Sequence, residues 1–205
     1  MKLTIATGVR VSGLAYPNAL LAILRDGVRI REVRLGAGAD FNILIELPPG
    51  MYNLGLVAED AVKQYSPVSA VVVRVNTEHV TEVSGIMLGP TLGTSPKSLV
   101  RGSLVTFFGQ TAPGASVTVR LTEPRNMLLQ TKASSLGIFS VAFDTGVLPL
   151  GVYTAIAFAT VSGLRSPASF LASFWVVKAP VIVPVGCQQR AALNGDCRVN
   201  LVDFD

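Results

Sequence analysis

The sequence predicts an all-β protein made of two consecutive β-sandwiches and a short C-terminal tail. Short runs rich in Val, Ile, Leu, Phe and Thr alternate apolar with polar residues, as residues 41–45 and 118–122 do. A period of two is typical of a strand with one buried face. Turn sequences with Gly, Pro, Asn or Asp interrupt these runs about every 8–12 residues, which favours a sandwich or barrel. Several marks also recur after roughly 100 residues, which indicates that one structural unit occurs twice.

Length and composition agree with a folded protein. The 205 residues are enough for two domains of about 100 residues each. Hydrophobic residues make up 50% and charged residues 15% of the chain, which is too apolar for a disordered protein. No apolar run approaches the ~20 residues that a membrane-spanning helix needs. We therefore expect a folded chain that does not insert into a membrane.

An internal repeat organises most of the chain. Four pairs of segments occur in the same order with similar spacing, and the third pair shares the pattern Leu-Pro-x-Gly-x-Tyr. We therefore predict two sandwiches with the same order of strands and turns. The paired segments are residues 13–19 and 109–115, 39–41 and 137–139, 47–52 and 148–153, and 65–67 and 165–167.

Two Pro-containing linkers predict the domain boundaries. The first, residues 89–96, is short and stiffened by Pro, so the two sandwiches should form an elongated rod. The second, residues 178–186, alternates Pro with β-branched residues and favours an extended spacer. We predict one sandwich over residues 1–88, a second over 89–178, and a linker with a tail segment over 179–205.

The tyrosines of the Leu-Pro-x-Gly-x-Tyr segments have a structural interpretation. A Tyr at the start of a late strand can fill the end of a sandwich core while its hydroxyl bonds to a nearby backbone group. We expect Tyr52 and Tyr153 to occupy equivalent places and to be largely buried. Gly50 and Gly151 could supply the unusual backbone angles of the preceding turn.

Residues 1 to about 178 resemble the tandem immunoglobulin-like modules of secreted bacterial proteins. The motifs that carry this resemblance are Tyr-Pro-Asn-Ala at 16–19, Pro-Pro-Gly-x-Tyr at 48–52, and the Ser-Pro pairs before the last strands. The resemblance implies two immunoglobulin-like β-sandwich domains. It also implies an extracellular or cell-surface location and a role as spacer, display scaffold or surface attachment module.

The tail carries a pattern of oxygen-bearing side chains. Asn194, Asp196, Asn200 and Asp203 fall at positions 3, 5, 9 and 12 of a calcium-type loop, and calcium takes six to eight oxygen ligands. An apolar residue, Val199, stands at position 8. The segment resembles the first calcium loop of a type I dockerin repeat. This resemblance implies calcium ligation by those four residues and a cohesin-type partner for the full-length parent protein.

Two departures from the dockerin pattern weaken the predicted calcium site. Position 1 is Ala192 instead of a carboxylate, and position 6 is Cys197 where a Gly normally permits the sharp turn. The chain also stops at Asp205, before a second repeat. We therefore expect calcium binding to be weak or absent. No other cofactor is predicted.

The two cysteines, Cys187 and Cys197, both lie in the tail. A disulfide between them would close a short loop. A metal-binding pair and two free thiols are the other interpretations. Cysteine count alone does not distinguish these states or the compartment.

The sequence shows no recognisable catalytic chemistry. Nucleophile-elbow, phosphate-loop and zinc-protease motifs are absent, and the single His79 fits a surface strand position. The acidic pair Glu59-Asp60 is interpreted as solvated at a strand end. The net charge of +4 is dispersed among apolar residues, so nucleic-acid binding is not expected. We predict that the chain is not an enzyme.

Two functions from different classes remain. The first is a non-catalytic spacer or display scaffold, and the alternative is a module that binds carbohydrate or a surface protein. A carbohydrate platform needs an exposed aromatic side chain, and the only Trp in the chain, Trp175, is the best candidate. An enzyme would need a cleft between the domains with a perturbed acid–base pair.

Overall fold

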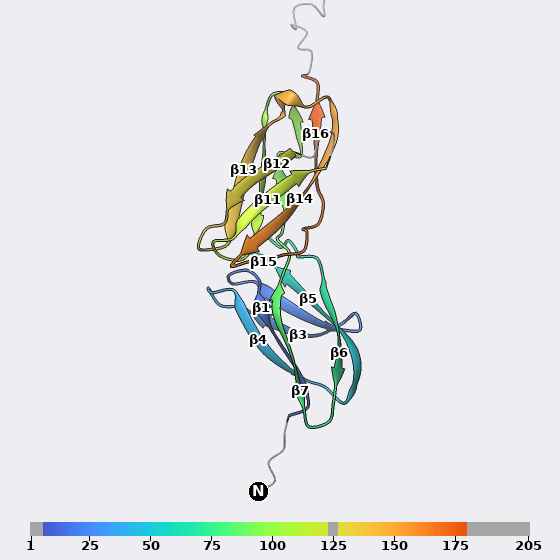
Figure 1. Cartoon of the computed structure of the whole chain (residues 1–205). Helices are drawn as coiled ribbons and strands as arrows, with labels where there is room; N and C mark the ends of the chain where they lie inside the picture. Colours follow the sequence, from blue (N-terminus) through green and yellow to red (C-terminus); the bar gives the residue numbers. More distant parts are fainter. Residues whose placement is uncertain (1–5, 123–126, 180–205) are drawn as a thin grey trace, which may run out of the picture.

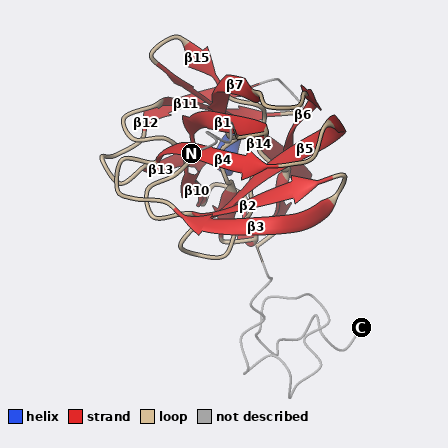
Figure 2. Cartoon of the chain, turned by 90° about the horizontal axis from the view of Figure 1, so that it is seen from below, coloured by secondary structure: helices blue, strands red, loops and turns tan. Residues whose placement is uncertain are grey.

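Two β-sandwiches are stacked end to end along the chain (Figure 1). The computed structural model describes residues 6–122 and 127–179. Strands dominate this part of the chain, and its one helical element is the 3-10 turn η1, Thr145–Val147 (Figure 2). None of its helical residues forms a segment that is long and apolar enough to cross a membrane. The predicted all-β class, with two tandem immunoglobulin-like sandwiches, is confirmed.

The first sandwich contains seven strands in two sheets. One sheet has the order β4-β1-β7, and the other has the order β3-β2-β5-β6. The strands are β1 (Gly8–Leu14), β2 (Leu20–Arg25), β3 (Val28–Arg34), β4 (Asp40–Glu46), β5 (Gly50–Glu59), β6 (Ser69–Val75) and β7 (Val80–Met87).

The second sandwich repeats this arrangement with additional short strands. Its smaller sheet has the order β13-β10-β8, and its larger sheet has the order β12-β11-β14-β16-β9, with β15 paired to β14. The strands are β8 (Gly93–Ser95), β9 (Ser98–Val100), β10 (Leu104–Gln110), β11 (Ser116–Leu121), β12 (Met127–Lys132), β13 (Ile138–Asp144), β14 (Gly151–Val161), β15 (Leu164–Arg165) and β16 (Ala172–Val177).

Strand register shows that the segments paired in the sequence are equivalent in space. Gly13 of β1 lies opposite Phe41 of β4, and Gly109 of β10 lies opposite Phe139 of β13. The turn after β1 places Asn18 at φ 58°, and the turn after β10 places Gly114 at φ 66°. The second repeat thus has Gly where the first uses Asn, a residue that also tolerates the left-handed region.

The two sandwiches differ in the strand beside β1 and its equivalent β10. In the first sandwich that place is taken by β7, which runs parallel to β1 and comes from the end of the unit. In the second it is taken by β8, which runs antiparallel to β10 and comes from the beginning. Because β8 starts at Gly93, the segment predicted as linker, residues 89–96, is in part a strand.

Each sandwich has its own hydrophobic core. Alternating residues such as Phe41, Ile43 and Ile45 of β4 point inward, as a period of two requires. The first core includes Tyr16, Leu21 and Leu56, and the second includes Phe107, Phe139 and Phe174. Apolar burial on this scale is the main stabilising contribution to such domains.

The paired tyrosines occupy equivalent places but differ in burial. The Tyr52 hydroxyl donates to the Pro48 carbonyl at 3.0 Å, and the Tyr153 hydroxyl donates to the Pro149 carbonyl at 2.7 Å. Tyr153 is buried, whereas Tyr52 is only partly buried against the first core, so the two equivalent side chains are buried to different degrees. Tyr153 stacks on its cross-strand partner Phe174, while the partner of Tyr52 is the smaller Val73, which covers less of the ring.

Candidate functional site

The predicted calcium ligands Asn194, Asp196, Asn200 and Asp203 lie outside the described residues. The same holds for Cys187 and Cys197. The calcium site and the state of the cysteines therefore stay predictions. Within residues 6–122 and 127–179, His, Cys, Asp and Glu form no group of three or more that could hold a metal ion.

Trp175 is exposed on the outward face of β16, with 45% of its surface accessible. A buried Trp175 could not contact a carbohydrate, but this side chain is exposed, so it remains a candidate contact. Its cross-strand partners are Val152 of β14 and Ser98 of β9. Neither partner is aromatic, so the paired strands give Trp175 no neighbouring ring with which to form a flat platform.

The junction between the two sandwiches is buried, and it includes the backbone of the first linker residues. Residues 87–91 are all buried, although they connect two domains. The Tyr16 hydroxyl, from the turn after β1, donates a buried hydrogen bond to the Gly89 carbonyl. Burial raises the pKa of Tyr16 well above its usual range, because the phenolate would lose its hydration. A Cβ at Gly89 would lie 3.1 Å from the Ala168 carbonyl oxygen, so the chain passes close to the second sandwich.

Asp60 is the centre of a hydrogen-bond chain across this junction. Its Oδ1 accepts from the backbone amides of Val62 and Gln64 at 2.9 and 2.8 Å. Its Oδ2 accepts from the Thr91 hydroxyl at 2.7 Å. The Thr91 Oγ1 in turn accepts from the backbone amide of Gln110 at 2.8 Å. This series of hydrogen bonds thus links the end of the first sandwich to β10 of the second.

The burial of Asp60 corrects an expectation. The pair Glu59-Asp60 was interpreted as solvated, but Asp60 is only 6% exposed. A buried carboxylate is tolerated when hydrogen bonds replace its hydration, and the turn amides and Thr91 do so here. The Glu59 side chain is itself largely covered, and its carboxylate pairs with the exposed Lys63.

Gln110 completes the junction from the side of the second sandwich. Its Nε2 donates to the Pro17 carbonyl of the first sandwich at 3.1 Å and to the Leu136 carbonyl at 3.0 Å. Gln110 stands at the repeat position of Leu14, where the first unit has an apolar side chain. This difference between repeats is a sequence signal that could have identified Gln110, and it was missed.

A small hollow of about 130 Å³ lies beside the junction, lined mainly by apolar side chains such as Val62, Phe108 and Ile138. Asp60 is its one ionisable lining residue. Both carboxylate oxygens of Asp60 accept hydrogen bonds, from the backbone amides of Val62 and Gln64 and from the Thr91 hydroxyl. Among the described residues, the lining of this hollow thus brings together no pair of ionisable side chains.

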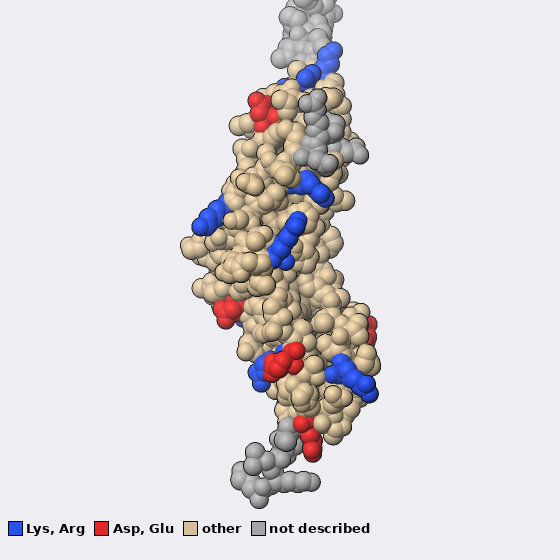
Figure 3. Space-filling model, viewed as in Figure 1, with Lys and Arg blue, Asp and Glu red and all other residues tan. Residues whose placement is uncertain are grey.

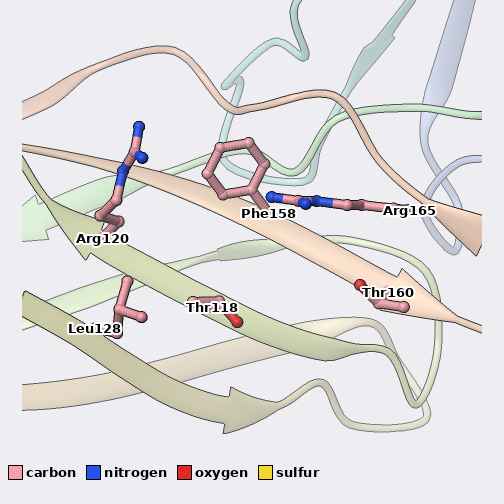
Figure 4. Close-up of a pocket in the computed structure, with 6 residues that line it drawn as sticks. All are labelled: Thr118, Arg120, Leu128, Phe158, Thr160 and Arg165. Atoms are coloured by element: carbon pink, nitrogen blue, oxygen red, sulfur yellow. The ribbon is translucent and has the colours of Figure 1, made fainter.

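A second candidate surface lies on the outward face of the larger sheet of the second sandwich. On β11 and β14 the inward positions are taken by core residues, so Thr118, Arg120 and Phe158 point outward. Thr118 lies opposite Phe158, and Thr160 lies opposite Arg165 of β15. These residues line a shallow groove of about 550 Å³, which we call the arginine groove (Figure 4).

The Phe158 ring stands between two guanidinium groups in the arginine groove (Figure 4). The Cζ of Arg165 lies 4.8 Å from the ring centroid, and that of Arg120 lies 5.8 Å from it. Both distances allow cation–π attraction, which holds the guanidiniums near the ring. Sequence alternation predicts that these positions face outward, but it does not show that two arginines from different strands meet at one ring.

Comparisons with known proteins give no assignment from sequence. No family model matches the chain, and no curated protein matches it. Among solved structures, chicken CNTN1 FN1-FN3 domains are 13% identical with a TM-score of 0.37, and the match covers 82% of this chain and 60% of that chain. Clostridium thermocellum CbhA fibronectin(III)-like modules are 13% identical with a TM-score of 0.34, and the match covers 88% and 95%. The D0-D1 domain of Intimin is 11% identical with a TM-score of 0.32, and the match covers 80% and 84%.

Proposed function

We propose that the chain is a non-catalytic spacer and display module of a secreted or cell-surface protein. In this proposal the sandwiches over residues 1–88 and 89–178 form one stiff rod, and residues 179–205 are a linker followed by a truncated dockerin-like segment. The observation that carries the proposal is the buried, hydrogen-bonded junction around Asp60, Thr91 and Gln110. A rod of this kind separates what lies at its two ends.

The energetics of the junction oppose bending. Rotation of one sandwich against the other would separate Asp60 from Thr91 and Gln110 from the Pro17 carbonyl. A hydrogen bond to a charged group contributes roughly 1.5–3 kcal/mol, and a buried polar group left without a partner costs about 1–3 kcal/mol. Several such losses would coincide in a bent molecule. The straight arrangement is therefore favoured over a freely jointed one.

Residual dipolar couplings of the full-length chain test the proposed stiffness. If the sandwiches move as one body, the amide couplings of both fit a single alignment tensor. Asp60→Ala/Gln110→Ala should then require two tensors of different magnitude. Asp40→Ala/Gln130→Ala alters two exposed residues of the same types and should keep the single tensor. Two tensors in the unmodified chain would overturn the proposal.

The tail adds a proposed attachment to this function. The resemblance of residues 192–203 to a dockerin loop supports a parent protein that engages a cohesin-type or other cell-surface partner. The absent first carboxylate at Ala192 and the Cys at position 197 favour weak calcium binding. Calorimetric titration with calcium should give a dissociation constant no tighter than about millimolar. Ala192→Asp/Cys197→Gly should strengthen binding, and no gain would mean that the dockerin register is wrong.

A further inference from the structure

We propose that the arginine groove binds the carboxylate or sulfate groups of an acidic polysaccharide. Arg120 and Arg165 are the anion contacts, and the Thr118 and Thr160 hydroxyls bond to sugar hydroxyls. This assignment rests on the proposed function, because a module displayed outside a cell meets such polymers there. It makes the second sandwich the displayed binding unit and the first its support.

The charge of the chain is unevenly divided between the two repeats. Residues 89–178 contain seven Lys and Arg against two Asp and Glu, whereas residues 1–88 contain eight of each. The ion pairs found among the described residues, Arg10–Glu82, Arg29–Glu32 and Lys63–Glu59, all lie in the first sandwich. The net positive charge is thus concentrated on the sandwich that carries the groove, and such a field raises the local concentration of an anionic polymer.

The face around the groove is free of opposing charge in the described part of the chain. Outward positions of β11, β12 and β14 carry apolar, hydroxyl, amide or basic side chains and no carboxylate. Lys132 lies on this face at the end of β12, opposite Ser116. The surface shown in Figure 3 is largely uncharged, with separate Lys and Arg side chains and a few separate Asp and Glu side chains. An anion at the groove would therefore face basic side chains and, among the described residues of these strands, no carboxylate.

The guanidinium of Arg120 is held in place but incompletely bonded. Its Nε atom is shielded from water and has no hydrogen-bond partner among the described residues. A buried donor without a partner is costly, so hydrogen bonds to the rest of the protein do not fully satisfy this guanidinium. Partial removal of water also strengthens the attraction between the cation and an anion. The Phe158 ring pre-orders both guanidiniums, which lowers the entropy lost on binding.

The chemistry of the groove favours an acidic glycan over other ligands. Guanidinium forks match the planar oxygens of carboxylates and those of sulfates. The two flanking Thr hydroxyls can donate and accept, as sugar hydroxyls require. Single-stranded nucleic acid needs aromatic faces on which bases stack, but Phe158 is already flanked by guanidiniums. The open, shallow shape on a sheet face lets a polymer pass across it.

Affinity electrophoresis and calorimetry of the full chain test the site. The probes are polygalacturonate, dextran sulfate, uncharged dextran and oligothymidylate, all at low and at physiological salt. We expect binding to the two acidic polysaccharides and none to uncharged dextran. Arg120→Gln/Arg165→Gln should weaken this binding by about tenfold or more, since both charge-assisted contacts are lost. Arg165→Glu, at an exposed position that folding tolerates, should do the same.

A matched control variant distinguishes binding at the arginine groove from nonspecific attraction of the polymer to a basic protein. Arg25→Gln/Arg74→Gln removes the same charge from exposed positions of the first sandwich and should change affinity by no more than about twofold. An equal loss in both double variants, no acidic-glycan binding, or tighter binding of oligothymidylate would overturn the assignment. If glycan binding fails while the single alignment tensor persists, the groove is rejected and the spacer function stands.

Discussion

The carboxylate of Asp60, in the first sandwich, accepts a 2.7 Å hydrogen bond from the Thr91 hydroxyl at the start of the second. The Thr91 hydroxyl itself accepts a hydrogen bond from the backbone amide of Gln110, so one buried residue of the linker is bonded to both sandwiches. The first part of the linker, residues 89–91, is buried and hydrogen-bonded to both sandwiches, so it behaves as part of the fold.

Replacement of Asp60 should destabilise the protein. Asp60→Ala leaves the amides of Val62 and Gln64 and the Thr91 hydroxyl without their acceptor, and the loss of a buried charged hydrogen-bonding group costs about 2–4 kcal/mol. Urea denaturation should show this decrease in the free energy of unfolding. Asp40→Ala, at an exposed position, should change it by less than about 0.5 kcal/mol. Equal effects of the two substitutions would show that the Asp60 bonds contribute little.

Removal of the two equivalent Tyr hydroxyls should have unequal effects. Tyr153→Phe loses a 2.7 Å hydrogen bond at a buried ring and should cost about 1 kcal/mol. Tyr52→Phe loses a 3.0 Å bond at a half-buried ring, where water can replace the hydroxyl, and should cost about half as much. Thermal and urea melts of the two variants measure the difference. A larger loss for Tyr52→Phe would contradict the role assigned to burial.

Stability should fall at high pH because of Tyr16. Its folded-state pKa lies above its ordinary value of 10.0, so the folded state holds a proton that the unfolded state releases. The resulting stability is fully present below about pH 10 and decreases as pH rises further, by about 1.4 kcal/mol per pH unit while the folded phenol stays protonated. Tyr16→Phe removes this contribution. Between about pH 9 and 11, the free energy of unfolding should therefore fall more steeply with pH for the unmodified chain than for Tyr16→Phe. Parallel pH dependences of the two proteins would contradict the role assigned to Tyr16.

Gly109 should not tolerate a side chain. A Cβ there would lie 2.1 Å from the Thr91 carbonyl oxygen, a backbone atom that cannot move without opening the junction. Gly109→Ala should therefore cost about 2–3 kcal/mol or more. Gly36→Ala meets open space and no positive φ, so it should be neutral within about 0.5 kcal/mol. Calorimetric melts provide the comparison, and a neutral Gly109→Ala would mean that β8 and β10 can separate at little cost.

The sequence predicted what depends on local pattern. Alternation in residues such as 41–45, turn residues and the repeated Leu-Pro-x-Gly-x-Tyr motif predicted strands, turns and equivalent units. The spatial equivalence of Gly13 and Gly109 follows from that repeat. The unequal burial of Tyr52 and Tyr153 depends on the side chain across the strand pair, which the motif does not contain.

The candidate sites were not predictable in the same way. The hydrogen bond between Asp60 and Thr91 depends on how the two domains meet, which the sequence pattern does not show. Judged from its sequence neighbours alone, Asp60 is predicted to be solvated. The arginine groove depends on the register of three strands, which brings Arg120 and Arg165 to Phe158 from positions 45 residues apart. Periodicity places each of these residues on a face but does not pair them.

The distribution of distances between the two sandwiches tests the rigid junction most directly. Spin labels at Val72→Cys and Val147→Cys would stand on exposed positions of the first and second sandwich, with Cys187 and Cys197 replaced by Ser. Pulsed electron paramagnetic resonance should give one narrow distance distribution, which broadens in Asp60→Ala/Gln110→Ala. A broad or multimodal distribution in the labelled chain with Asp60 and Gln110 intact would contradict the stiff rod.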